Sequence, residues 1–145
     1  MASRKAIYDA CIGALNDSTS INYVTIDIAE NAWNFKYNMF PAVRIIDGEE
    51  NITRLAFPDD VTDDMESELP LEFVGYVIKG KGSIDLRRNA LMVDIEKALT
   101  GSTAIDDLVK DITPQERGTD RGYSDGVGWT NGVFRVLYHY NHLDP

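Results

Sequence analysis

The most constraining feature of this sequence is a strand-like segment followed directly by a capped, helix-like one. The segment LEFVGYVIK, residues 71–79, is apolar on both faces, which is typical of a strand covered on both sides. A glycine-rich turn then leads to IDLRRNALMVDIEKAL, which has Ser83 before it as a helix N-cap and Gly101 after it as a stop. We therefore expect a central strand and a helix that packs against its sheet.

The remaining segments predict further strands and one more helix. Ser3 can cap a helix that runs to about Asn16, with apolar residues at helical spacing. Asp47-Gly48 is a two-residue turn signal, so we expect a hairpin from Val43 to Phe57. Other strands are expected at 21–28, 33–40, 105–113 and 133–140, and loops at 57–70 and 114–131. The pattern predicts one domain over residues 1–145 of class α+β, with a single mixed or antiparallel sheet and two helices packed on one face.

The composition limits the partners of this chain. With 14 basic and 24 acidic residues among 145, the net charge is −10, which disfavours tight binding of duplex DNA or an anionic membrane. No run approaches the ~20 apolar residues of a membrane span, and Asp9 interrupts the only candidate for a signal peptide. The single cysteine, Cys11, falls in register with the apolar stripe of the first helix, so we expect a buried thiol in a reducing cytoplasm.

The stretch FPDDVTDDMESELP, residues 57–70, contains six carboxylates and no cation. The calcium-loop pattern fails there, because Met65 stands at the required glycine when the pattern starts at Asp60. The general expectation for such a run is a solvated acidic loop. We interpret it as a candidate partner-binding segment, made of Asp59, Asp60, Asp63, Asp64, Met65, Glu66 and Glu68.

Other motifs fail as chemical sites. Gly75 with Gly80-Lys81 has the spacing of a phosphate-binding loop, but Gly82 replaces the magnesium-binding Ser or Thr. His139 and His142 are expected on opposite faces of a strand, where their spacing does not suit a metal. No Ser/His/Asp set is recognisable. The sequence therefore predicts no enzyme, no cofactor and no metal.

The alternating aromatic residues Trp33, Phe35 and Tyr37 allow three interpretations. They could form a stacking platform for single-stranded nucleic acid, a half-buried strand, or an aromatic subunit contact. Only Lys36 supplies positive charge between them, which disfavours nucleic acid. The half-buried strand and the subunit contact stay open.

Three segments together resemble bacteriophage tail terminator, or tail completion, proteins. They are PAVRI at 41–45, LEFVGYVIKGKGSIDLRRNALMVDIEKAL at 71–99, and the closing GVFRVLYHY at 132–140. In those families a short N-terminal helix precedes strands, then a strand ending near "GYV", a helix and a last strand. The similarity spans most of the chain, although its motifs are generic packing patterns. Segments 29–40 and 113–131 look longer than a minimal member needs.

The resemblance implies a structural virion protein at the head–tail junction, assembled in the host cytoplasm. It implies a homo-oligomeric ring, a hexamer, that caps the tail tube, stops its polymerisation and meets the head-side connector. An acidic channel would let viral DNA pass without binding. Another neck component, such as a head-completion or connector-adaptor protein, and a small nucleotide-binding module are the alternatives. Candidate subunit-interface residues are Trp33, Phe35, Tyr37, Phe40, Asp47, Gly48, Tyr123 and Trp129.

Overall fold

The chain folds as an α+β protein with one open mixed sheet. A computed structural model describes residues 3–26, 35–57, 60–78, 83–119 and 126–141, with only the backbone for residues 37, 56–57 and 60–63. The described helical and strand elements are α1 (Arg4–Asn16), β1 (Tyr23–Thr25), η2 (Tyr37–Met39), β2 (Ala42–Asp47), β3 (Asn51–Phe57), β4 (Asp60–Ile78), α2 (Ile84–Thr100), α3 (Thr103–Asp106), β5 (Asp111–Thr119) and β6 (Val127–Asn141). The predicted fold class is confirmed.

The long strand β4 organises the sheet. Among the described residues the strand order is β1-β2-β4-β6-β5, and β3 pairs with the first half of β4. β1 runs parallel to β2, whereas every other pairing is antiparallel. β4 and β6 pair from Asp64–Asn141 to Ile78–Val127. The strand predicted at residues 71–79 is thus central, and it begins eleven residues earlier than expected.

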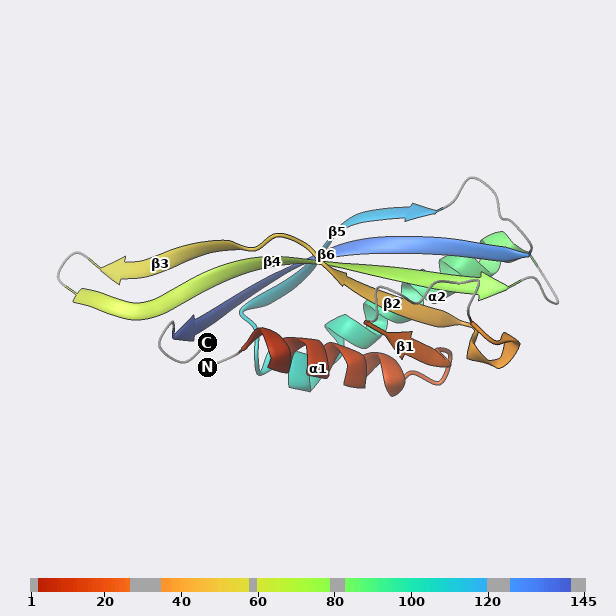
Figure 1. Cartoon of the computed structure of the whole chain (residues 1–145), viewed down its shortest axis with the longest axis horizontal. Helices are drawn as coiled ribbons and strands as arrows, with labels where there is room; N and C mark the ends of the chain where they lie inside the picture. Colours follow the sequence, from red (N-terminus) through yellow and green to blue (C-terminus); the bar gives the residue numbers. More distant parts are fainter. Residues whose placement is uncertain (1–2, 27–34, 58–59, 79–82, 120–125, 142–145) are drawn as a thin grey trace.

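Helices α1 and α2 pack on one face of this sheet, as predicted (Figure 1). The Ser3 hydroxyl accepts a hydrogen bond from the amide of Ala6, and Ser83 caps α2 in the same way. The core between the layers includes Phe73 and Phe134, whose rings meet edge to face at 5.4 Å and are fully buried. Gly75 allows α2 to come close, because a Cβ there would lie 2.6 Å from a Leu91 methyl carbon.

A smaller apolar cluster covers part of the opposite face. Phe35 and Phe40 are buried there and pack edge to face with each other, and Phe35 also packs on Tyr23 and Tyr76. Because alternate residues of a strand point to opposite faces, Tyr76 lies on the face away from Phe73. This cluster explains why β4 is apolar on both faces near its end.

The predicted hairpin from Val43 to Phe57 is wrong. β2 and β3 do not pair with each other; they follow one another along the same edge of β4, β2 opposite 71–76 and β3 opposite 60–68. Asp47-Gly48 therefore bridges two collinear strands. The Gly48 amide donates to the Pro70 carbonyl at 2.9 Å, and a Cβ on Gly48 would lie 2.6 Å from the Pro70 ring. Glycine is needed here for this close approach.

The predicted acidic loop at 57–70 is also wrong, because Asp60 to Pro70 form the first half of β4. From Asp64 onward the carboxylates alternate with other residues, so Glu66 and Glu68 lie on the face opposite the buried Ser67 and Leu69. Pro70 is tolerated inside β4 because it sits where the neighbouring edge changes from β3 to β2, and the ladder needs no N–H there.

Four further segments differ from the predictions. Residues 35–40 form no strand, because Phe35 and Phe40 both turn toward Tyr76 around the short helix η2. The segment expected to be a strand at 105–113 begins as α3, and β5 starts at Asp111. The loop expected at 114–131 is largely strand, since β5 continues to Thr119 and β6 begins at Val127. The strand expected at 21–28 is described only for Tyr23–Thr25.

Candidate interaction surfaces

The sheet extends past its helices as a three-stranded arm. The arm consists of β3, residues 60–68 of β4 and residues 138–141 of β6, and Figure 1 shows these strands projecting beyond the start of α1. The strands are joined in cross-strand rows, such as Ile52–Ser67–Tyr138 and Arg54–Met65–Tyr140. The arm is therefore held by backbone ladders and cross-strand pairs, with little helix cover.

One face of the arm contains the carboxylates. Glu66 lies 2.8 Å from the Nε2 atom of His139, and Glu68 forms an ion pair with Arg135. Further along the same face, Glu72 accepts a hydrogen bond from the Asn131 amide at 3.0 Å. All of these side chains are partly exposed. The predicted partner-binding residues Asp64, Glu66 and Glu68 thus share one strand face, and Met65 points to the other.

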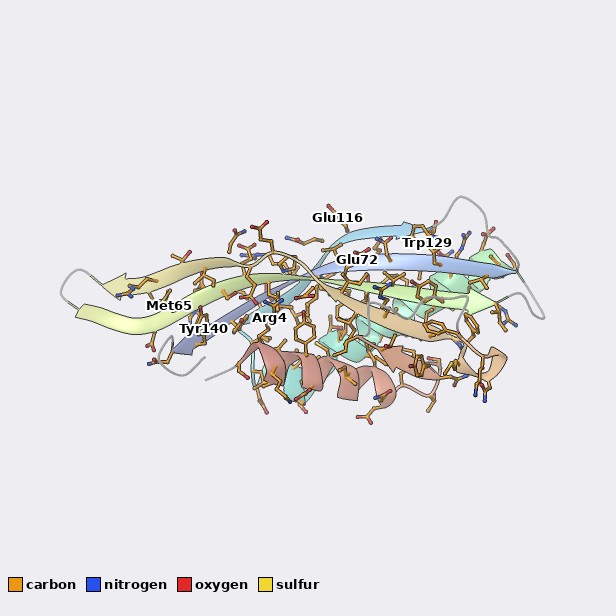
Figure 2. All side chains as sticks on the ribbon, in the orientation of Figure 1. Arg4, Met65, Glu72, Glu116, Trp129 and Tyr140 are labelled. Carbon is orange, nitrogen blue, oxygen red and sulfur yellow. The ribbon has the colours of Figure 1, made fainter. Side chains whose placement is uncertain are left out.

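The second face of the arm is mixed, with apolar side chains and the exposed Arg54 in one cross-strand row. Ile52 is 51% exposed, while Met65 and Tyr140 are half-buried. Figure 2 shows Met65 and Tyr140 on the arm, beyond Arg4 at the start of α1. We call Ile52, Met65 and Tyr140 the arm patch. Asp59, Asp60 and Asp63 belong to the same acidic stretch, but Asp59 and the side chains of Asp60 and Asp63 lie outside what the structure describes.

A polar junction connects the arm to the body. The Glu50 carboxylate accepts hydrogen bonds from the Ser67 hydroxyl at 2.8 Å and the Tyr138 hydroxyl at 3.3 Å, and it lies 3.1 Å from the Arg4 guanidinium. Arg4 also forms an ion pair with Asp47. Burial is the main cause that raises the pKa of Tyr138. The junction fixes the chain between β2 and β3 against the first turn of α1.

The candidate subunit-interface residues are distributed over several places. Phe35 and Phe40 are buried in the smaller apolar cluster, and Gly48 packs against Pro70. Trp129 is 39% exposed on the sheet face away from the helices, where Figure 2 also shows Glu116. Asp47 belongs to the polar junction, and Tyr37 lies in η2. Trp33 and Tyr123 lie outside the described residues.

The residues that imitate a phosphate-binding loop serve the fold in this structure. Gly75 to Ile78 continue β4, paired with β6, and Gly75 accommodates Leu91. Residues 79–82 lie outside the described ranges. His139 contacts Glu66, and His142 is not described. Across the described residues, no group of three His, Cys, Asp or Glu side chains is arranged to hold a metal. Cys11 is fully buried, as predicted, and burial raises the pKa of its thiol to about 12.

Sequence reasoning missed the exposed face of α2. Leu86 is 70% exposed and Val93 is 45% exposed, and Asn89 and Ala90 between them are exposed as well. We call these four residues the α2 ridge. The signal was present in the sequence, because Leu86 and Val93 are seven residues apart and so lie on one side of the helix, opposite the stripe that contains Leu91.

Two grooves run along the sides of the α2 ridge. One, of about 270 Å³, is lined by α2 residues such as Arg87 and Ala90 together with Phe40. The other, of about 400 Å³, is lined by Val93 of α2 and by residues of β5 and β6, including Arg117. A third cavity, of about 660 Å³, lies between the end of α1 and the α2–α3 connection and is lined by a mixture of Ser, Thr, Ala and charged residues.

No helix in the described part of the chain is long and apolar enough to cross a membrane. Comparison of the chain with protein-family models and with curated protein sequences gave no match.

Proposed function

We propose that this chain is a structural subunit of a bacteriophage neck, a tail terminator that assembles into a ring, caps the tail tube and meets the head-side connector. The observation that carries the proposal is the arm. A sheet ribbon that extends past its helices buries little of its own surface, so its stability and purpose are best explained by contacts with other chains. A structural, non-catalytic role follows from this proposal.

The surface area of the chain supports an assembling subunit. The accessible surface is 8444 Å², whereas a compact monomer of 16.2 kDa exposes about 7,500 Å². The chain therefore exposes more surface than a compact monomer of its mass, as expected for a subunit that buries part of its surface in an assembly.

The order of elements supports the resemblance to tail terminators. PAVRI leads into β2, the segment 71–99 forms the second half of β4 and nearly all of α2, and the closing segment lies in β6. An N-terminal helix, strands, a central strand, a helix and a last strand is the order that the resemblance implies. The ring stoichiometry of six comes from the resemblance alone.

The net charge supports a ring through which DNA passes. Every subunit contributes a net charge of −10. Repulsion between like charges prevents the contacts with DNA phosphates that would give affinity. On this proposal the protein resides in the virion at the head–tail junction, binds its own copies, the tube protein and the connector, and leaves the DNA unbound.

Electron microscopy of the purified protein, alone and mixed with uncapped tail tubes, tests the proposal. We expect rings, and rings seated on one end of each tube that prevent further tube growth. A protein that stays monomeric in light scattering, with and without tubes, and that leaves tube growth unchanged would contradict the proposal. Binding to connector rings without tube capping would instead identify another neck component.

A further inference from the structure

The arm has an open strand edge on each of its two sides. Among the strands that the structure describes, β3 pairs with β4 alone, and β5 pairs with β6 no further than Leu137. The outer side of β3 and the outer side of residues 138–140 in β6 therefore present backbone edges. The N–H and C=O groups along such an edge are a template for pairing with a strand of another chain.

The long edge strand of the body, β5, is built differently. It contains Pro114, which has no N–H, a register shift between Pro114 and Glu116, and the charged residues Glu116 and Arg117. Prolines, bulges and charges of this kind keep an edge strand from pairing. Residues 51–54 of β3 contain no proline and one charged residue, and they precede the register shift of their strand. The arm edge is therefore better suited to pairing than the edge of β5.

The directions of the strands determine how two arms can join. β3 and β6 are both antiparallel to β4, so the two edge strands of the arm run in the same direction. When the β3 edge of one copy meets the β6 edge of the next, the new pair is parallel. Each copy then gives one edge to each of two neighbours, which is a heterologous contact. A join of two identical edges would instead be isologous and antiparallel.

The side chains at the two edges complement each other on both faces. Arg54 and Tyr140 lie in one cross-strand row and so point to the same face, where Arg54 is exposed and Tyr140 is half-buried. Across the junction, the guanidinium of one copy can cover the ring of the next. Ile52, on the same face, comes within reach of that ring as a diagonal neighbour. On the other face Thr53 and His139, which also share a row, place polar groups side by side.

We propose that the β3 edge of one copy pairs in parallel with residues 138–140 of β6 in a second copy, with Arg54 beside Tyr140. The neighbour's β3 then follows β5 along the same edge of β6, as β3 follows β2 along β4. The junction deepens the proposed function, on which it rests, because it names the edges by which ring subunits join. A ring joined in this way has a continuous sheet of arms, and the arm edges are no longer exposed.

Crosslinking between two variants that each carry one added cysteine tests this junction. Arg54→Cys and Tyr140→Cys chains are prepared separately, mixed before assembly, and treated with a short bifunctional thiol reagent, with and without tail tubes. The native Cys11 does not compete, because it is fully buried and burial raises the pKa of its thiol to about 12. We expect the mixed dimer to exceed both like-with-like dimers, since paired strands lie about 4.8 Å apart.

A second pair and a matched control accompany this experiment. Thr53→Cys with His139→Cys reports on the opposite face of the same junction and leaves the Tyr140 ring in place, so it should give the same excess of mixed dimer. The control mixes Arg54→Cys with Glu116→Cys, because Glu116 is also exposed on an edge strand. Its partner Val133 lies about 23 Å along β6 from Tyr140, too far for the reagent.

The outcomes separate this junction from the proposed function. Mixed dimers at the control level for both pairs, from a protein that forms rings on tail tubes, overturn the junction and leave the function standing. Dimers formed only between like variants also overturn it, because they indicate isologous pairing. Strong mixed crosslinking from a protein that never caps tubes supports the junction and contradicts the function. Crosslinking at the control level without ring formation or capping contradicts both.

Discussion

The body and the arm of this protein are built on the same strand but are stabilised differently. In the body, alternate side chains of β4 such as Leu71 and Phe73 are fully buried beneath α1 and α2. In the arm the same alternation continues, but Met65 is only half-buried because no helix lies over it. One strand therefore serves as the centre of a core over half its length and as a ribbon over the other half. Burial under the helices therefore stabilises the body, whereas the proposed function uses the uncovered arm for contacts with other chains.

The largest expected effect comes from truncating the body core. Phe73→Ala should lower the free energy of unfolding by about 3–5 kcal/mol, because it removes a fully buried ring and its edge-to-face contact with Phe134. Ile52→Ala in the arm should cost less than about 1 kcal/mol, since half of that side chain is already exposed. Urea unfolding of both variants measures the difference. Equal losses would mean that the arm belongs to the same cooperative core.

The body could be predicted from sequence because its signals are local. Ser3 and Ser83 cap helices whose apolar stripes repeat at helical spacing, and both helices begin within one residue of the expected position. The final strand was recognised from Phe134, Val136 and Tyr138, which alternate into the core as expected. In these segments local propensity and burial in the tertiary structure favour the same conformation.

The arm could not be predicted because its pairing is non-local. Asp47-Gly48 has the composition of a hairpin turn, yet β4 is long enough to pair with β2 and β3 end to end. The carboxylates and Pro70 suggested a loop, although alternation of Glu66 and Glu68 with Ser67 and Leu69 was present. An alternating pattern with an acidic face and a proline is weak evidence for a strand when the strands that pair with it are not known. The arm patch and α2 ridge were missed for the same reason.

A smaller effect is expected in the pH dependence of stability, and it comes from a buried thiol of the body. Burial raises the pKa of the Cys11 thiol to about 12, whereas the ordinary value is 9.0. Between these values the unfolded chain has lost a proton that the folded chain keeps, so stability is fully present below pH 9 and falls as pH rises. From pH 8 to pH 10 this thiol should cost about 1.4 kcal/mol.

Comparison with Cys11→Ala isolates that contribution. Burial also raises the pKa values of Tyr8 and Tyr138, so these tyrosines make both proteins less stable as pH rises. The difference between the two slopes therefore comes from Cys11, mainly from its own thiol and to a lesser extent from its effect on Tyr8. Urea unfolding at pH 8 and pH 10 gives both slopes. Identical slopes would show that Cys11 reaches solvent in the folded state, which would weaken the contrast between a closed body and an open arm.

The smallest effect on stability, and the largest on association, should come from the aspartates of the acidic stretch 59–64. Asparagine at Asp59, Asp60, Asp63 and Asp64 removes mutual repulsion, so unfolding should shift by no more than about 0.5 kcal/mol, toward greater stability. Complementary charge governs association rate and register more than affinity, so the variant should capture tail tubes more slowly and with weaker salt dependence. The matched control places asparagine at four exposed body aspartates, Asp17, Asp106, Asp107 and Asp111, and should capture tubes normally.

Two outcomes would contradict this prediction. Normal capture at every salt concentration by the variant of the acidic stretch, with DNA retained in the ring, would assign the carboxylates of that stretch to the channel lining. An unfolded arm variant would show that they pair internally or hold a cation.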